Sequence, residues 1–258
     1  MLDFKQIESF YPENLRVFKR NLMREYLQYK ILSIIYDSPY GQKLAFMGGT
    51  ALRIAYEHSR FSEDLDFDNL GIDRDEFENM TILIKNKLEK EGYAIEIKNV
   101  FLGAYHCYIR IKDVLYDLGM SGHKEEKLLI QIDTEPQKFK YKPEQIVLNK
   151  FDVFLRINMV PANILLSQKI YAIFHRKRSM GRDFYDTVFL LGRGKPDFRY
   201  LREKMDIEDI PELKKRLLEK CKDLNFKVLA KDIEPFLLSA GDAKKVLLFR
   251  DYIRSLAQ

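Results

Sequence analysis

The chain has 258 residues, of which 46% are hydrophobic and 32% charged, a composition typical of a folded globular protein that excludes extended disorder. Its net charge of +5 is compatible with an RNA partner, but this charge is equally common among proteins that bind no nucleic acid. No apolar run approaches the roughly 20 residues that cross a bilayer, and residues 1–5 carry no signal-peptide pattern, so we expect a cytoplasmic protein with no membrane partner.

A long helix is the first predicted element. Apolar side chains recur at mostly helical spacing over residues 13–36, and the turn-forming sequence at 37–41 ends the pattern. A short apolar run over residues 44–47 then predicts a buried strand, because it is too short and too apolar for a surface helix. We expect the long helix to precede this strand as part of one core.

A glycine pair follows that strand. Gly48 and Gly49 give the backbone a freedom that other residues lack, and Thr50 is expected to cap a helix that continues to about Tyr56. The N–H groups at a helix start can bind an anion, so this turn is a candidate phosphate site. The same residues also suit an ordinary tight turn, and the turn alone leaves both interpretations open.

Two aspartates follow in an alternating pattern. Asp64 and Asp66 alternate with Leu65 and Phe67, so in a strand both carboxylates share one face. Carboxylate oxygens are ligands that Mg²⁺ and Mn²⁺ prefer. The solvated face of an amphipathic strand has the same pattern. Asp68 has the right parity too, but the strand is expected to end at 69–71, so we exclude Asp68 from the candidate site.

The next segments alternate helix and strand. Residues 73–91 predict a helix that Gly92 ends, and 93–101 with 105–111 predict a hairpin. The apolar segment 128–133 predicts another strand, which ends in Asp133. We place it beside the Asp64 strand, where Asp133 supplies a third carboxylate for a two-metal site, although a strand terminus often carries an aspartate without function.

Helices dominate from about residue 161. Residues 163–176, capped by Asn163, carry Lys169, which is either a surface lysine or a phosphate ligand. Residues 182–192 present Asp183 and Asp186 on one helix face, either as functional groups or as a solvated pair, and Asp183 could instead balance the neighbouring arginines.

The basic turn at 176–178 between these two helices is a candidate RNA contact, although such a run is usually solvated. Arg60, farther back in the chain, either contacts phosphate or pairs with Glu63.

The order of these elements predicts an α+β fold. A small mixed β-sheet with its helices occupies residues 1–155, and a helical domain occupies 156–258. We expect an active-site cleft between the two domains.

Several motifs taken together resemble the AbiEii/AbiGii-type nucleotidyltransferase toxins of the DNA polymerase β nucleotidyltransferase superfamily. The shared motifs appear in order over about residues 40–192: Gly48 to Leu52, Arg60 with Ser62 to Phe67, Asp133, Lys169, and Arg182-Asp183-Phe184-Tyr185-Asp186. The resemblance implies a magnesium-dependent or manganese-dependent nucleotidyltransferase core with an NTP as substrate. It also implies a role for each matching residue.

These implied roles fall into three groups. The metal ligands are Asp64, Asp66 and Asp133. The catalytic residues are Asp64, Asp66, Asp133, Lys169 and Asp183. The nucleotide-binding residues are Gly48, Gly49, Thr50, Lys169, Arg182 and Asp186.

The acceptor of the nucleotide is left open. Some members of the family add nucleotides to the tRNA 3′ end, and the resemblance suggests a separately encoded antitoxin that acts without a tight complex. The alternatives are an enzyme that modifies a protein or a small molecule such as an aminoglycoside, and a non-catalytic module that binds or senses a nucleotide. Neither the preferred NTP nor the oligomeric state follows from the sequence.

Overall fold

The computed structural model describes residues 1–256, which form two compact units. The sheet unit comprises Met1–Glu57 and Phe61–Val160, and the helical unit comprises His58–Arg60 and the chain from Pro161 onward. The short segment His58–Arg60 therefore leaves the sheet unit, joins the helical unit and returns before the aspartate-bearing strand. The expected α+β class with a mixed sheet is confirmed.

Within residues 1–256, seven strands form one mixed sheet in the order β3-β4-β5-β2-β1-β7-β6. The strands are β1 (Leu44–Met47), β2 (Leu65–Asn69), β3 (Ile95–Leu102), β4 (Ala104–Ile111), β5 (Leu128–Glu135), β6 (Glu144–Lys150) and β7 (Val153–Met159). The central strand β2 pairs antiparallel with β1 and parallel with β5. It therefore lies in the interior of the sheet, where both neighbours fix its register.

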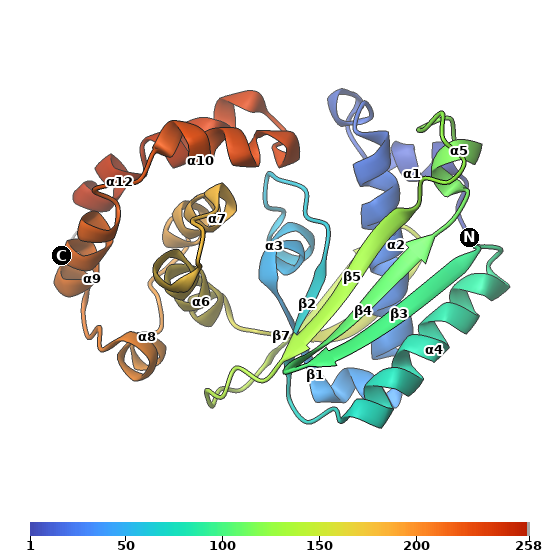
Figure 1. The fold of residues 1–258 in the computed structure, drawn as a ribbon, viewed down its shortest axis with the longest axis horizontal. Helices are drawn as coiled ribbons and strands as arrows, with labels where there is room; N and C mark the ends of the chain where they lie inside the picture. The colour runs from blue at the N-terminus through green and yellow to red at the C-terminus, as the bar shows by residue number, and fades with distance from the viewer. Residues whose placement is uncertain (257–258) are drawn as a thin grey trace. The chain divides into compact units, whose positions relative to one another are not determined.

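Helices α2 and α4 pack beside each other against this sheet (Figure 1). The helices of the sheet unit are α1 (Phe4–Ser9), α2 (Lys19–Tyr36), α3 (Gly48–Tyr56), α4 (Arg74–Lys90) and α5 (Val114–Asp117), with 3₁₀ turns η1 (Glu13–Leu15) and η2 (Pro39–Lys43). The expected helix at 13–36 is thus divided into η1 and α2, whereas the expected helix at 73–91 matches α4 closely.

The helical unit contains α6 (Ala162–His175), α7 (Gly181–Leu191), α8 (Phe198–Met205), α9 (Ile210–Lys220), α10 (Phe226–Ile233), η3 (Glu234–Phe236), η4 (Ala240–Ala243), α11 (Lys244–Leu247) and α12 (Phe249–Ser255). Helix α7 packs against α6 and α10 and buries Phe184, Tyr185 and Leu190 together with two aspartates. Gly181 permits the approach of α10, because a Cβ there would lie 1.9 Å from the carbonyl oxygen of Leu229. Asn163 was expected to cap α6, but the structure places the cap at Pro161.

Candidate functional site

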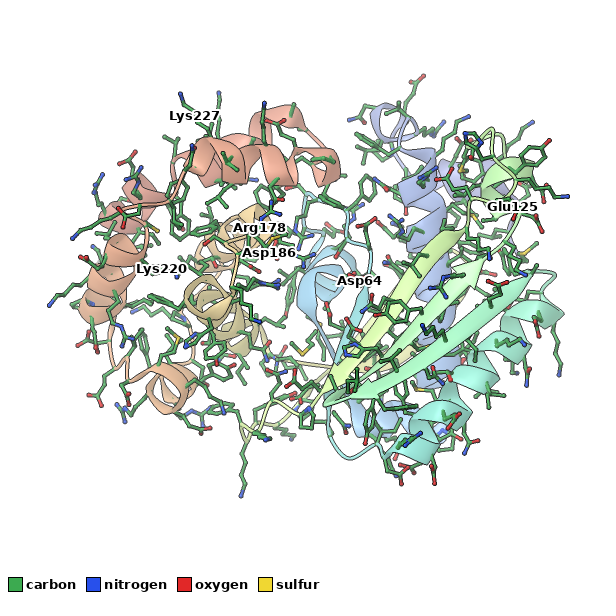
Figure 2. The ribbon with its side chains drawn as sticks, in the orientation of Figure 1. Asp64, Glu125, Arg178, Asp186, Lys220 and Lys227 are labelled. Carbon is green, nitrogen blue, oxygen red and sulfur yellow. The ribbon has the colours of Figure 1, made fainter. Side chains whose placement is uncertain are left out.

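The register of two parallel strands brings two of the candidate carboxylates to neighbouring positions. Asp66 on β2 lies opposite Asp133 on β5, so the predicted placement of the Asp133 strand beside the first aspartates is confirmed. Asp64 immediately precedes β2, two residues from Asp66 (Figure 2). Leu65 and Phe67 alternate with the aspartates and are buried, which anchors the strand in the core.

The glycine turn approaches Asp66 closely. Gly48 has a φ of +80°, and a Cβ built on it would lie 2.0 Å from Oδ2 of Asp66. Only glycine fits this position, because any side chain would displace the carboxylate and strain the backbone. The structure thus places the start of α3 directly beside a candidate metal ligand.

Thr50 does not cap α3, contrary to the sequence-based expectation. The helix begins two residues earlier at Gly48, with Met47 at the N-cap and no capping side chain. Thr50 is fully buried, and its hydroxyl donates to the carbonyl oxygen of Asp64. The expectation failed because the helix already begins at the glycine pair, so Thr50 lies within the first turn, whose N–H groups have no partner in the helix.

A buried glutamine steadies the segment that leads into Asp64. The side-chain nitrogen of Gln28, on α2, donates to the carbonyl oxygens of Ser62 at 3.1 Å and Glu63 at 3.0 Å. Together with Thr50, it fixes three successive carbonyl groups in front of β2. The sequence gave no indication of this role, since Gln28 stands within an ordinary helical pattern 34 residues from its partner.

Asp133 has two side-chain partners that the sequence analysis missed. The Nδ1 atom of His106 lies 2.6 Å from its Oδ1, and the Gln131 amide donates to both carboxylate oxygens at 2.8 and 3.0 Å. His106 stands directly opposite Asp133 in the antiparallel pairing of β4 with β5. The predicted hairpin carried a usable signal, because its register determines which residue faces Asp133.

Asp68 is built into the protein in a different way. It is buried, accepts a hydrogen bond of 2.9 Å from the backbone nitrogen of Gln137, and accepts another of 2.5 Å from the Tyr141 hydroxyl. Burial raises the pKa of this carboxyl, while the two hydrogen bonds act in the opposite direction. Asp68 therefore holds the segment after β5 in place.

In the helical unit, Asp186 is the acceptor at the centre of a buried charge cluster. Its fully buried carboxylate on α7 (Figure 2) accepts from Arg60 at 2.6 and 2.7 Å and pairs with Lys169 at 2.8 Å. Burial by itself would raise the pKa of Asp186, but Arg60 and Lys169 hold this pKa well below its usual range. Lys169 is not a surface lysine, since only 12% of its side chain is exposed.

His58 completes this cluster. Its Nε2 lies 3.0 Å from Oδ1 of Asp186, and its ring is fully buried against Tyr185 and Phe189. Burial lowers the pKa of His58 to about 4, although the neighbouring Asp186 favours the charged form. The imidazole is therefore neutral at pH 7, and we assign its proton to Nε2, because a carboxylate only accepts hydrogen bonds.

Arg60 does not pair with Glu63, which was one of its two expected roles. Glu63 pairs instead with Arg24 at 2.7 Å, and Arg60 turns to Asp186. The pairing with Asp186 joins residues 126 positions apart in the chain, and no local spacing predicts it.

Asp183 lies one turn before Asp186 and has a different environment. It is 1% exposed, Arg176 Nε lies 2.7 Å from its Oδ2, and Lys169 is more distant at 3.9 Å. Neither carboxylate oxygen has a hydrogen bond of good geometry. The Arg176 contact is thus a close ion pair, which makes Arg176 a structural partner of Asp183.

The rest of the basic turn is more open. Arg178 is 76% exposed and approaches Asp232 at 3.6 Å, and Lys177 is exposed (Figure 2). Arg182 is partly buried at the start of α7. Arg176 is 40% exposed but pairs with buried Asp183, so Lys177 and Arg178 are the residues of this turn best placed to contact a charged partner.

The carboxylates of the sheet unit suit a hard divalent cation, but they do not form a complete cage. Within residues 1–256, no group of three or more His, Cys, Asp or Glu side chains is gathered in a metal-binding arrangement. Magnesium commonly binds through one or two carboxylates together with substrate phosphates. Asp66 and Asp133 are adjacent, and the turn at Gly48 adjoins Asp66. This arrangement fits a mode of binding in which the nucleotide supplies the missing metal ligands.

Comparison with known proteins identifies relatives of this arrangement. A family model described as "Nucleotidyl transferase AbiEii toxin, Type IV TA system" matches residues 30–243, which confirms the resemblance seen in the motifs. A search of proteins of curated function finds no match. No helix of residues 1–256 is both long and apolar enough to cross a membrane.

Two solved structures from Helicobacter pylori share the fold. The crystal structure of JHP933 is 19% identical with a TM-score of 0.53, and the match covers 90% of this chain and 91% of that one. A putative nucleotidyltransferase is also 19% identical with a TM-score of 0.52, and the match covers 92% of this chain and 97% of that one. At this identity the likeness establishes the fold alone.

Proposed function

This chain belongs to the AbiEii family of nucleotidyl transferase toxins from type IV toxin–antitoxin systems, and from that premise we propose that it transfers a nucleoside monophosphate from an NTP to an acceptor hydroxyl with the help of Mg²⁺ or Mn²⁺. The observation that carries the proposal is the convergence of Gly48, Asp66 and Asp133 at adjacent backbone positions. A type IV toxin has a separately encoded antitoxin, and we propose that it acts without a tight complex.

In the proposed mechanism, Asp64 and Asp66 hold the metal, and the first-turn N–H groups of α3 at Gly48, Gly49 and Thr50 bind the triphosphate. Bound metal supplies Lewis-acid charge that stabilises the attacking and leaving oxygens. Asp133 completes the metal ligands and takes the proton of the acceptor hydroxyl. Support for this last role comes from His106 and Gln131, which fix the orientation of its carboxylate.

For the helical unit we propose the roles that family membership implies. Lys169 neutralises charge that develops on the phosphates, and Asp186 contributes to nucleotide binding by orienting the Lys169 ammonium, with which it pairs. Asp183 is proposed to be catalytic and Arg182 to contact the nucleotide.

An RNA acceptor, such as the tRNA 3′ end, is favoured by the uneven distribution of charge. The helical unit contains 22 Lys and Arg against 14 Asp and Glu, a net of eight positive charges. The sheet unit contains 22 against 25, a net of three negative charges. The positive charge of the helical unit suits binding of a polyanion, because each neutralised phosphate releases counterions.

The test is incubation with α-labelled NTPs, magnesium and a mixture of total RNA, total protein and an aminoglycoside. Label on RNA supports the proposal, label on protein or on the aminoglycoside assigns a different acceptor, and no label on any acceptor supports the non-catalytic sensor.

The RNA contact itself is tested by exchanging Lys177 and Arg178 together for Gln. Arg176 is left intact because it pairs with buried Asp183. The slope of log RNA affinity against log salt should flatten by roughly 1.4 to 1.8 units. Lys87→Gln with Lys90→Gln on α4 removes the same charge from the sheet unit and should leave the slope unchanged.

A further inference from the structure

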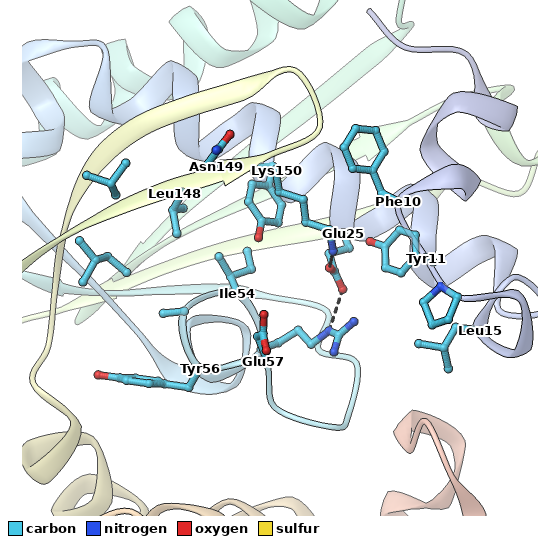
Figure 3. A pocket seen from close by; sticks show the side chains of 16 residues that line it. Phe10, Tyr11, Leu15, Glu25, Ile54, Tyr56, Glu57, Leu148, Asn149 and Lys150 are labelled. Carbon is cyan, nitrogen blue, oxygen red and sulfur yellow. Dashed lines mark hydrogen bonds and ion pairs between the residues drawn. The ribbon is translucent and has the colours of Figure 1, made fainter.

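A cavity opens within the sheet unit, and none of the residues that line it has been given a role in nucleotidyl transfer. Its volume is about 770 Å³, which lies within the range of small-molecule sites. Residues 10–12, helix α2, the last turn of α3 and strand β6 line it (Figure 3). Its lining contains charged groups of both signs and four aromatic rings.

At one side of the cavity, one buried carboxylate is shared by two cations. Glu25 accepts from Arg53 at 2.9 Å and from Lys150 at 2.7 Å, as Figure 3 shows for the Arg53 bond. With Glu57, which also lines the cavity, its wall carries two cations and two carboxylates, so both signs of charge are present. Lys150 is the more exposed of the two cations, with 24% of its side chain accessible.

The Lys150 ammonium lies among aromatic rings and carboxylates, and 24% of the side chain remains accessible. Its ammonium lies 4.1 Å from the ring centroid of Tyr11, a favourable but weak interaction. Burial lowers the pKa of Lys150, although Glu25 and Glu57 both favour its charged form. An anionic group entering the cavity would therefore be stabilised beside Lys150.

The C-terminal end of α3 presents negative charge to the cavity. Arg53, Ile54, Ala55 and Tyr56 form its last turn and line the cavity, and the Arg53 side chain pairs with Glu25. The carbonyl groups of a last helical turn have no partner within the helix and form the negative end of its dipole. Glu57, which follows in the left-handed conformation, adds an exposed carboxylate to this end. This part of the cavity favours a cation.

The remaining walls suit a flat apolar group that can also form hydrogen bonds with the backbone. The rings of Phe10, Tyr11, Tyr29 and Tyr56 line the cavity. Five successive residues of β6, 146–150, also line it, although their side chains alternate between the two faces of the sheet. The cavity therefore borders the backbone edge of β6, which is the last strand of the sheet.

We propose that this cavity binds a small zwitterion of the α-amino-acid class with an aromatic side chain. The carboxylate of the ligand pairs with Lys150, its ammonium group with Glu57 and the carbonyl end of α3, and its ring packs among the tyrosines. Charges of both signs within a single aromatic cavity match such a ligand better than a simple anion or cation. This site is separate from the nucleotidyl transfer chemistry and does not depend on it.

The experiment measures binding to the full-length protein by calorimetry and by backbone amide shifts. The probes are L-phenylalanine, 3-phenylpropanoate, which lacks the ammonium group, and phenethylamine, which lacks the carboxylate. L-Phenylalanine should bind at least about tenfold more tightly than either analogue, because each lost charge-assisted hydrogen bond costs about that factor. Equal affinity for the three probes, or no binding of L-phenylalanine at millimolar concentration, would overturn the proposal.

Glu57→Gln is the decisive variant, because the Glu57 side chain is exposed and its loss does not endanger folding. It should weaken L-phenylalanine binding by about tenfold and leave 3-phenylpropanoate binding unchanged. Glu78→Gln, at an exposed position on α4, is the matched control and should change neither. Lys150→Met should weaken the binding of L-phenylalanine and leave the binding of phenethylamine unchanged. This variant also removes a partner of buried Glu25. An unchanged affinity of Glu57→Gln for L-phenylalanine contradicts the proposal whatever Lys150→Met does.

Discussion

A Cβ atom on Gly48 would lie 2.0 Å from Oδ2 of Asp66. The first residue of α3 therefore packs against the candidate metal ligand on β2 with no room for a side chain between them. The glycine turn and the aspartates are therefore parts of one arrangement. A side chain added at residue 48 would displace the Asp66 carboxylate.

Gly48→Ala should abolish nucleotidyl transfer. Gly103→Ala is an unusually close control, since Gly103 has a φ of +79° against +80° for Gly48 but has no atom within 4 Å of its added Cβ. Both variants bear the left-handed strain of about 1 to 2 kcal/mol, whereas only Gly48→Ala displaces Asp66. Transfer assays with thermal melts separate the two effects, and equal activity of both variants would disprove the steric argument.

Protonation of His58 should govern stability between about pH 4 and 6.5. In this window the unfolded chain binds a proton at His58 that the folded chain excludes, so stability falls as the pH decreases, by about 3 kcal/mol across the full window. Chemical denaturation at several pH values measures the slope. His58→Gln should lose this contribution, and His123→Gln, an exposed control, should retain it. The lowered pKa of Asp186 also contributes stability, which is lost mainly as the pH falls below the ordinary carboxyl range, under the window assigned to His58.

Lys169→Met should reduce transfer by roughly 10²-fold, the usual loss for a positioned charge in an active site. Lys169→Arg should rescue activity poorly, because a guanidinium differs in shape from the compact ammonium that fits beside Asp186. Asp186 keeps its two bonds from Arg60, so the fold should persist. Lys195→Met, an exposed lysine of the same unit, serves as the control. Parental rates in Lys169→Met would restrict Lys169 to a structural role.

The central strands could be predicted from the sequence, and the hairpin of β6 and β7 could not. Short apolar runs next to glycine or aspartate identified β1, β2 and β5, because local composition determines a buried strand. Within residues 144–159, β7 does alternate buried Val153, Leu155, Ile157 and Met159 with more exposed residues, but no turn signal separates it from β6. Their two-residue turn at Phe151 and Asp152 lacks the Asn-Gly or Asp-Gly sequence of a typical hairpin, and Phe151 itself adopts a φ of +59°.

The candidate carboxylates could be predicted, but their partners could not. Asp64, Asp66 and Asp133 stand in recognisable strand patterns, whereas Gln28 and His58 act on residues 34 to 128 positions away. Such long-range contacts follow from how the elements pack. His106 is the intermediate case, since a correct register for the predicted hairpin would have placed it opposite Asp133.

The most direct test of the account follows two positions of label in the same NTP. With magnesium and the acceptor identified above, label at the α-phosphate should enter the acceptor and label at the γ-phosphate should leave as pyrophosphate. Asp66→Asn, which keeps the size of the side chain beside Gly48, should lower this transfer by at least about a hundredfold, as should removal of metal by a chelator. Transfer of the γ-label, or full α-label transfer by Asp66→Asn, would contradict a metal-dependent nucleotidyltransferase.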